Sequence, residues 1–331
     1  TAYEIRNCDW SSDVCSSDLG WVVLEELRLR PLVVDLGCAV APAVPHLRLP
    51  PPAGGGSAAC ISTGAAMARA RVEALLAQGR RMGLGQAKSQ RGGVPSPLLL
   101  AECVPGGTTT AQAVLTGLGI EAGGIVSGSL HRPAHALKAD LVARALAAAS
   151  LANPQGISAL TPAGEPDPLA VMAALGDPMQ ALAAGLLLAC VEADQPVMLA
   201  GGCQMAAVLA LGLALLPAAQ RNRLAELAAV GTTAWVADEP ESDLGLLLDR
   251  VGRRWQVDPL ALAASLRFRG ALQPALMDYE RGYVKEGVGA GGLALLWELS
   301  GRSPESLAKA CDAACQTLLR KGQDRPMPGY R

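Results

Sequence analysis

The feature that most constrains the fold of this 331-residue chain is a glycine turn between an apolar strand and an apolar helix. Residues 98–100 (LLL) predict a buried strand, and residues 102–110 (ECVPGGTTT) then lead into a helix expected over residues 109–118. Strand–turn–helix units of this kind are typical of parallel α/β sheets. Backbone N–H groups at a helix N-terminus, together with hydroxyls, can bind a phosphate. Four residues are therefore candidate phosphate ligands, with a purely structural turn as the alternative: Gly106, Gly107, Thr108 and Thr109.

A second glycine turn lies near the end of the chain, at residues 283–292 (YVKEGVGAGG). Its one carboxylate, Glu286, is followed by glycines, which have no side chains. Gly287 and Gly289 allow the main chain to approach a ligand closely. A lone carboxylate in a weakly polar turn can serve as a general base. The alternative is that Glu286 caps the helix that begins just after it. A phosphate-binding turn together with a base indicates an enzyme.

Short apolar runs alternate with longer helical patterns along most of the chain. This alternation predicts a three-layer α/β fold with a mostly parallel, Rossmann-like sheet flanked by helices. In such sheets ligands bind beyond the carboxyl ends of the strands, which is where the first glycine turn falls. Strands are expected at residues 32–36, 98–101, 124–126, 197–200 and 227–230. Helices are expected at residues 64–82, 109–118, 134–149, 169–190, 203–216, 244–251, 273–281, 288–299 and 304–319.

The composition excludes several classes of partner. The formal net charge is −2 and aromatic residues make up only 3% of the chain, whereas a nucleic-acid-binding surface needs a basic stripe with stacking aromatics. The longest apolar stretch, residues 197–219, is interrupted by Gly201, Gly202 and Gln204. We therefore read it as a strand, a turn and a core helix, and expect no membrane span.

The cysteines and histidines give no metal site. Of nine cysteines, Cys8 and Cys15 lie in the first nineteen residues, and the other seven show no CxxC pair and follow no signal peptide. Such a pattern is typical of reduced thiols in the cytoplasm. His131 and His135 are spaced to share one helical face, but no third ligand accompanies them. We expect a cytoplasmic protein without metal or cofactor.

The first nineteen residues do not read as part of the fold. Residues 1–5 (TAYEI) and 9–19 (DWSSDVCSSDL) match, in one frame, the translation of two segments of a sequencing adapter. We expect residues 1–19 to be adapter-derived and disordered. Residues 20–331 are then expected to form a single α/β domain that is truncated at its N-terminus.

Six segments in order carry a resemblance to a known family. Neither glycine turn matches a Walker loop or a dinucleotide fingerprint. Together, however, the segments resemble the nicotinate-nucleotide:dimethylbenzimidazole phosphoribosyltransferase family, and more closely its prokaryotic branch with a PGGTTT loop and a VKEGVGAGG turn. They are residues 102–114, 135–146, 176–189, 196–211, 229–240 and 282–293.

The resemblance implies a reaction in cobalamin nucleotide-loop assembly. A benzimidazole-type base displaces nicotinate from the ribose of nicotinate mononucleotide and gives α-ribazole 5'-phosphate. Glu286 matches the catalytic carboxylate of the family, and Lys138 matches its phosphate-binding lysine. For Lys138 the alternative is a solvated helix lysine paired with Asp140. The resemblance also implies a homodimer when the protein is full length.

The resemblance also assigns the other candidate residues. Thr232 and Thr233 fall in a second phosphate or ribose loop, and Glu102 and Gln204 are candidate contacts of the acceptor base. Glu102 has a plain turn-capping role as its alternative. Because the loop of this chain, PGGTT, differs from the GIGNTT form of the well-studied branch, a different acceptor is also compatible with the sequence. The alternative to an enzyme is a non-catalytic nucleotide- or phosphosugar-binding accessory protein or sensor.

Overall fold

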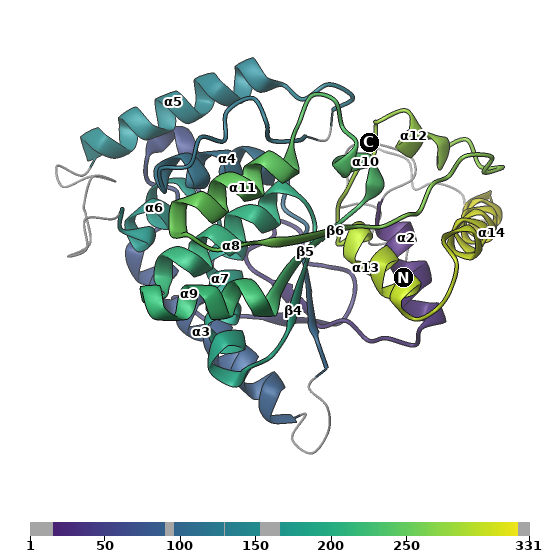
Figure 1. The fold of residues 1–331 in the computed structure, drawn as a ribbon, viewed down its shortest axis with the longest axis horizontal. Helices are drawn as coiled ribbons and strands as arrows, with labels where there is room; N and C mark the ends of the chain where they lie inside the picture. The colour runs from purple at the N-terminus through teal and green to yellow at the C-terminus, as the bar shows by residue number, and fades with distance from the viewer. Residues whose placement is uncertain (1–15, 90–95, 129, 153–165, 324–331) are drawn as a thin grey trace.

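The main sheet has four parallel strands in the order β3-β4-β5-β6 (Figure 1). The computed structural model describes residues 16–89, 96–128, 130–152 and 166–323. Leu98 lies opposite Val197 in the pairing of β3 with β4, and each further pair is parallel as well. The predicted three-layer parallel α/β fold is confirmed. The four strands are β3 (Leu98–Ala101), β4 (Val197–Ala200), β5 (Ala228–Thr232) and β6 (Leu260–Ala263).

The two faces of the sheet bury two different cores because successive side chains of a strand point to opposite sides. Leu98, Leu100 and Leu199 pack into the larger apolar cluster. Leu99 and Met198, the residues between them, pack into the smaller one. The strands therefore hold both cores together. The edge strand β6 is exposed along its whole length.

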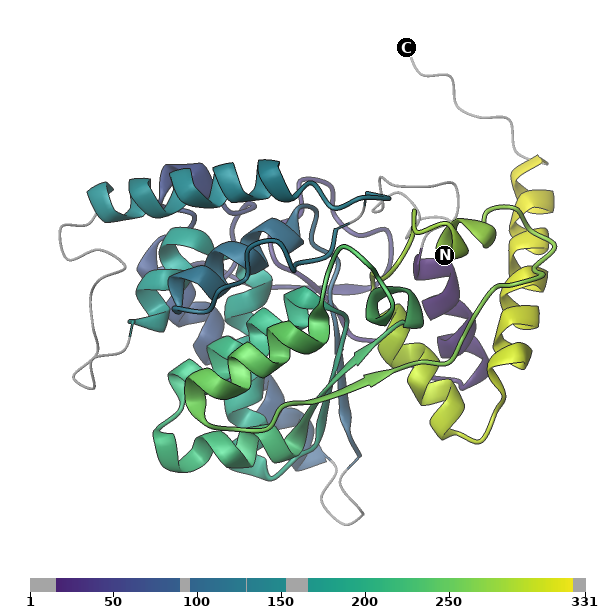
Figure 2. The ribbon, with the colours of Figure 1, turned by 45° about the horizontal axis from the view of Figure 1, so that its top comes forward.

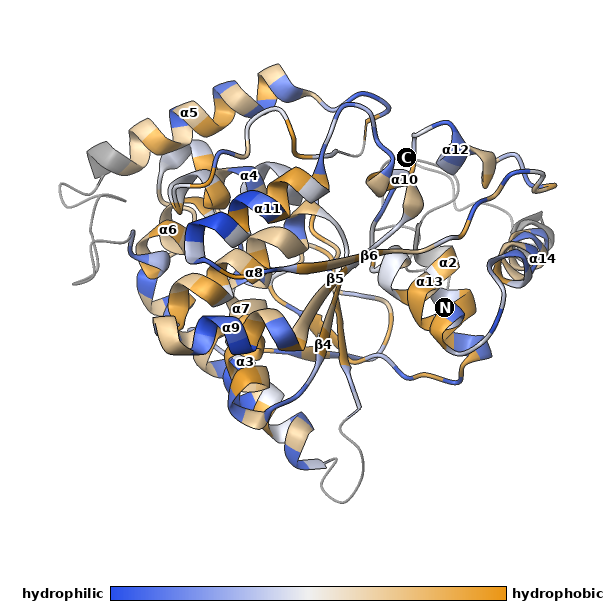
Figure 3. Cartoon of the chain, in the orientation of Figure 1, coloured by the Kyte–Doolittle hydropathy of each residue, from blue (hydrophilic) through white to orange (hydrophobic). Residues whose placement is uncertain are grey.

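The larger core lies between the sheet and the helices that connect its strands. Helix α8 is buried almost all round, as expected of an apolar helix in the middle of a domain. Figure 3 shows hydrophobic residues on the strands and the inner helices, and hydrophilic residues along α9 and α11. These helices are α3 (Arg69–Ser89), α4 (Gly107–Gly117), α5 (His135–Ala152), α6 (Pro168–Leu175), α7 (Pro178–Ala193), α8 (Cys203–Leu215), α9 (Ala218–Leu227) and α11 (Leu244–Trp255).

The smaller core lies on the opposite face, where helices from both ends of the described chain gather (Figure 2). Its centre is aromatic: the ring centroids of Trp235, Phe268 and Tyr279 are 4.7–5.3 Å apart. Helix α13 lies directly on β4 and β5, because Gly291 and Gly292 leave no side chain between them. The helices of this layer are α2 (Ser16–Glu26), α10 (Ala234–Ala237), α12 (Met277–Glu280), α13 (Ala290–Leu299) and α14 (Pro304–Gln323).

One strand prediction is wrong, and another is confirmed as a strand that lies outside the main sheet. Residues 124–126 form a turn and loop, since Gly124 has a φ of +75°, which a strand does not allow. The predicted strand at residues 32–36 is β1 (Val33–Asp35), but it pairs with β2 (His46–Arg48) in a separate small sheet. A short 3-10 helix, η1 (Ile61–Thr63), follows that sheet. Neither β2 nor β6 was expected from the sequence.

The helix predicted over residues 169–190 is two helices. Gly176 is the C-cap of the first, and Asp177 caps the second. The Asp177 carboxylate accepts from the Gln180 N–H, while the Gln180 side chain accepts from the Asp177 N–H. Pro178, at the first position of α7, also suits a helix start. This break places a polar group at the level of the strand ends.

The expected disorder of residues 1–19 does not extend to its last four residues. Residues 16–19 are the first turn of α2, and Leu19 is buried in the smaller core because it belongs to the apolar face of that helix. Residues 1–15 lie outside the described part of the chain. Among the described helices, none is both long and apolar enough to cross a membrane.

Candidate active site

The two glycine turns meet at the carboxyl ends of the strands. Glu102 directly follows β3, and its carbonyl oxygen accepts a hydrogen bond from the N–H of Val288, 3.1 Å away, in the second turn. Gln204, in the first turn of α8 after β4, donates from Nε2 to Oε1 of Glu102 at 2.8 Å. Residues far apart in sequence thus form one polar edge, as expected of a parallel sheet.

Glu102 is held in an environment that favours its protonated form. Its Oε2 accepts from the Val104 N–H at 2.9 Å. Burial first, and then the neighbouring carboxylates of Asp177 and Glu286, raise the pKa of Glu102 to about 8, against the hydrogen bonds from Val104 and Gln204. A carboxyl group of this kind carries its proton at neutral pH and is able to donate a hydrogen bond.

The first glycine turn forms the N-terminus of α4. Gly106 is in the left-handed conformation, with a φ of +73°, and Gly107 begins the helix. A Cβ on Gly107 would lie 1.7 Å from Oε1 of Gln204, so glycine is needed for this close approach. Thr108 and Thr109 are half-buried in the first turn of the helix. The N-terminus of an eleven-residue helix is a suitable place for a phosphate.

Glu286 accepts four hydrogen bonds. Oε2 accepts from the Thr232 hydroxyl and the Thr233 N–H, each at 3.0 Å. Oε1 accepts from the N–H groups of Gly287, at 3.2 Å, and Gly291, at 3.0 Å. Burial raises the pKa of Glu286 above that of an ordinary glutamate, and the four donors partly offset this rise. The carboxylate therefore caps α13 and also faces the strand ends.

The second turn fits against the strands because its glycines leave no gap. Gly289 has a φ of +75°, and a Cβ there would lie 2.6 Å from the Cβ of Ala101 and 3.2 Å from that of Ala200. Gly287, which directly follows Glu286, has a φ of +142°. The backbone geometry thus fixes Glu286 relative to β3 and β4.

Thr232 and Thr233 serve the second turn. The Thr232 hydroxyl donates to Glu286, and the Thr233 hydroxyl donates to the carbonyl oxygen of Lys285. Both side chains are buried. Within the described structure these threonines therefore position the carboxylate.

Lys138 is buried, which contradicts a solvated lysine paired with Asp140. Its Nζ donates to the carbonyl oxygens of Val126 and Ser127, while Asp140 pairs with Arg144 at 2.9 Å. Burial lowers the pKa of Lys138, and the nearby ammonium of Lys285 lowers it further. The Ser127 N–H donates to Sγ of Cys203 at 3.4 Å, which links this corner to the start of α8 beside Gln204.

Three further residues near Lys138 were not predicted from the sequence as part of the site: Ser127, Glu239 and Lys285. Together with Lys138 and Cys203 they form what we call the corner. Lys285 and Glu239 form an ion pair whose side chains are 5% and 4% exposed, and the Ser127 hydroxyl donates to the same carboxylate. Lys285 lies inside the second glycine turn, and this position was the only available signal. Its partner is 46 positions away in sequence.

The histidines do not converge on a metal. The rings of His131 and Tyr283 are 5.1 Å apart, whereas Nε2 of His135 lies 2.6 Å from the carbonyl oxygen of Glu241. Across the described residues, no group of three or more His, Cys, Asp and Glu side chains could hold a metal ion.

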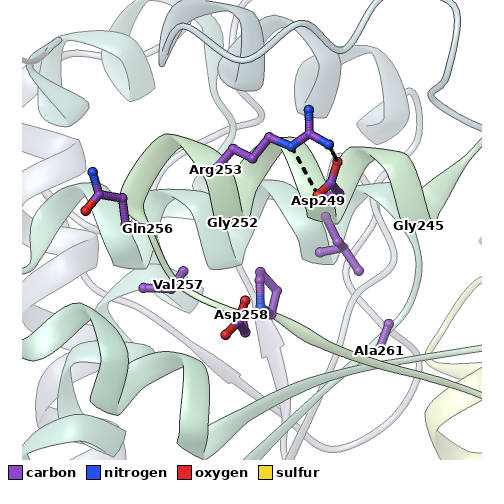
Figure 4. Close-up of a pocket in the computed structure, with 10 residues that line it drawn as sticks. Gly245, Asp249, Gly252, Arg253, Gln256, Val257, Asp258 and Ala261 are labelled. Atoms are coloured by element: carbon purple, nitrogen blue, oxygen red, sulfur yellow. Dashed lines mark hydrogen bonds and ion pairs between the residues drawn. The ribbon is translucent and has the colours of Figure 1, made fainter.

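A separate hollow lies on the outside of the molecule. Figure 4 shows it between α11 and the segment that leads into β6, with a volume of about 460 Å³. Arg253 at its rim pairs with Asp249 one helical turn away, at 2.8 Å. Gly245 and Asp258 also line it. No buried charge converges there, and we therefore place the candidate site at the strand ends.

Comparisons with known proteins agree with this fold. Two crystal structures from Thermus thermophilus, described as CobT and as nicotinate-nucleotide-dimethylbenzimidazole phosphoribosyltransferase, each superpose with a TM-score of 0.53. They are 21% and 22% identical, and the alignments cover 91% of this chain and 78% and 77% of those chains. At this identity the similarity shows a shared fold.

Closer relatives and a family model show the family. A UPF0284 protein of Parasynechococcus marenigrum is 49% identical over 308 residues, covering 91% of this chain and 72% of that protein. Another, of Prochlorococcus marinus, is 47% identical over 307 residues, covering 91% and 71%. A family model described as phosphoribosyltransferase matches residues 22–225. The chain therefore belongs to the phosphoribosyltransferase family, together with these UPF0284 proteins.

Proposed function

We propose that this enzyme transfers the phosphoribosyl group of nicotinate mononucleotide to a benzimidazole-type base, giving α-ribazole 5'-phosphate and nicotinate. The observation that carries the proposal is the position of Glu286, a half-buried carboxylate at the strand ends. It lies in the turn whose Val288 N–H donates to the carbonyl oxygen of Glu102. The family and the fold of the CobT structures support the reaction class. The choice of donor and acceptor rests on the sequence motifs.

In this reaction the bond between C1' of ribose and the pyridinium nitrogen breaks, and its electron pair neutralises the leaving nicotinate ring. A ring nitrogen of the azole forms the new bond to C1', and the N–H proton of the azole passes to Glu286. Burial raises the pKa of Glu286 and so makes it a stronger base. A carboxylate at this place also stabilises the positive charge that develops on the ribose.

The four hydrogen bonds of Glu286 indicate how it accepts the proton. Two donors on each oxygen occupy both of its lone pairs. Three of them are backbone N–H groups, which are fixed, and the fourth is the Thr232 hydroxyl, which can rotate. We infer that Thr232 turns away and leaves a lone pair of Oε2 for the azole proton.

The donor phosphate is assigned to the N-terminus of α4 and to Lys138. Gly106, Gly107 and the hydroxyls of Thr108 and Thr109 present donors at the helix start. Lys138 is a buried ammonium that donates to two carbonyl oxygens, and a phosphate would neutralise its charge. Glu102, protonated at neutral pH, and Gln204 are assigned to the acceptor base.

A proton NMR time course with nicotinate mononucleotide and dimethylbenzimidazole tests the proposal. We expect free nicotinate and a new α-anomeric proton signal. In Glu286→Gln the amide cannot take the proton, so kcat should fall about 10²–10⁴-fold while nucleotide affinity stays close to that of the wild type. Transfer at the wild-type rate by Glu286→Gln would exclude Glu286 as the base.

One observation favours a second candidate, a nucleotide- or phosphosugar-binding protein without transfer chemistry. All four acceptor positions of Glu286 are filled, as they would be for a carboxylate that only caps α13. This candidate predicts broadening of the nucleotide signals in the same NMR experiment without release of nicotinate. For either function we propose a cytoplasmic homodimer without cofactor, and sedimentation of the purified chain tests the dimer.

A further inference from the structure

Lys285 lies between the backbone near Gly128 and the turn that carries Glu286. Its ammonium donates to the carbonyl oxygens of Leu130 at 2.9 Å, and of Gly128 and His131 at 3.4 Å each. It also pairs with the buried carboxylate of Glu239. These four acceptors outnumber its three protons, so the side chain is fully engaged with the protein.

The backbone of Lys285 is tied to the opposite side. Its carbonyl oxygen accepts from the Thr233 hydroxyl, and the next residue is Glu286, which is bonded to Thr232 and Thr233. One residue therefore connects the backbone around Gly128, beside the carbonyl groups that Lys138 binds, with the turn that carries the carboxylate.

The ion pair of Lys285 with Glu239 is not explained by a gain in the free energy of folding. Desolvating two charges costs several kcal/mol, and a buried pair often adds little to the net free energy of folding. Among the described residues, the groups that interact electrostatically with Lys138 include the amino group of Lys285 and one carboxylate, that of Glu239. Burial raises the pKa of Cys203 to about 11, and its thiol is neutral. The corner thus holds more amino groups than carboxylates, an arrangement that favours a bound phosphate.

We propose that Lys285 is a positioning residue for transfer: with Glu239 it ties the backbone at Gly128, Leu130 and His131 to the Glu286 turn, so that the phosphate end and the base keep one fixed geometry. This inference rests on the proposed function. Lys285 itself does not contact the nucleotide, because its protons are used within the protein. Its loss should therefore lower kcat and leave donor affinity nearly unchanged.

The test is the double variant Lys285→Met with Glu239→Gln, which removes both charges and leaves neither one buried alone. The side-chain oxygen of the introduced glutamine would still accept from Ser127 and Ser242, as the carboxylate does. We expect kcat to fall about 10–100-fold, since small misplacements of reacting groups have effects of this size. The dissociation constant of nicotinate mononucleotide should change by less than about threefold.

The matched control is Arg80→Met with Glu192→Gln, which removes an ion pair between α3 and α7 on the outside of the molecule. Its kcat should equal that of the wild type. An unchanged kcat in the Lys285 double variant would overturn the proposal. A large loss of nucleotide affinity with an unchanged kcat would overturn it as well, because Lys285 would then act as a phosphate ligand.

Amide hydrogen exchange of the ligand-free protein tests, without measuring turnover, whether Lys285 couples the two backbone segments. In the double variant, exchange should become faster at Gly128, Leu130 and His131 and, together with them, at Gly287 and Gly291. Faster exchange in the first group alone would overturn the proposal. If the wild type shows no transfer, the proposed function fails while this measurement still tests Lys285. If the double variant does not fold, Glu239→Gln is measured in the same way, with the same criteria.

Discussion

Glu102 differs strongly from an ordinary glutamate. Its pKa of about 8 means that the folded protein keeps a proton that the unfolded chain releases near the ordinary glutamate value of 4.5. Burial is the main cause, and Asp177 and Glu286, whose own pKa values burial raises, add to it. All three carboxyl groups therefore favour the folded state at low pH.

This proton has a measurable effect on stability. The folded state binds more protons than the unfolded state between about pH 4.5 and 8, so the free energy of unfolding should decrease as the pH rises through this range. The slope from one group is at most about 1.4 kcal/mol per pH unit. Urea unfolding of the wild type and of Glu102→Gln at pH 5 to 9 measures it. A slope that is equal in the two proteins would contradict the assignment to Glu102.

Thr232 gives a second prediction at the scale of one residue. Thr232→Val removes one donor from the Glu286 carboxylate and should raise the pKa of Glu286 further. The acidic limb of the kcat/KM profile, which reports the free enzyme with this hydrogen bond in place, should therefore move to higher pH, by up to about one unit for a single hydrogen bond. Thr232→Ser, which keeps the hydroxyl, is the control and should retain the wild-type profile. A limb at the same pH in all three proteins would argue against Glu286 as the titrating base.

At the scale of elements, the contact between α13 and the sheet places the carboxylate. A Cβ on Gly291 would lie 2.1 Å from the carbonyl carbon of Thr232, and one on Gly292 would lie 2.4 Å from the Cβ of Ala200. Contacts this short force the helix away from the strands. The Gly291 N–H, a donor to Glu286, would move with it.

Gly291→Ala should therefore lower both stability and activity. We expect a loss of about 1–3 kcal/mol in the free energy of unfolding, typical of overpacking, and a lower kcat. Gly123→Ala, which meets nothing within 4 Å, is the control and should change the free energy of unfolding by less than about 1 kcal/mol. A Gly291→Ala protein as stable as the wild type would show that α13 moves freely on the sheet.

The sequence predicts the elements that carry strong local signals. Strands β3 and β4 lie where predicted because apolar runs are followed by glycine turns there, and the two glycine-rich motifs locate Gly107 and Glu286. Strand β6 was missed because Leu260–Ala263 consists of leucine and alanine, which favour helices, and only its pairing with β5 makes it a strand.

The features of the site that were not predicted from the sequence depend on contacts between residues far apart in the chain. Glu239 and Lys285 each look like ordinary surface charges, and only the fold buries them against each other. Likewise, Asp177 becomes a neighbour of Glu102 because α7 starts at the level of the strand ends. A break between α6 and α7 was detectable in principle from Gly176, Asp177 and Pro178, a combination typical of a helix start.

At the scale of the whole molecule, one sheet supports both cores, and we expect them to unfold together. Trp255 lies in the larger core and Trp297 in the smaller one. Variants that keep only one of these tryptophans, with phenylalanine at the other tryptophan positions, should give coincident urea transitions by fluorescence. Two separate midpoints would contradict the single domain predicted for residues 20–331.

The exposed edge strand β6 has a practical consequence for work with the purified protein. Leu260 and Leu262 are 51% and 37% exposed on a strand that, within the described structure, pairs on one side only. Unprotected apolar edges of this kind promote sheet-to-sheet association, and natural proteins often block them with lysine. Leu260 pairs with Ala229 near the start of β5, at the end of the sheet away from the catalytic turns. Leu260→Lys is therefore a good first choice for keeping concentrated samples in solution.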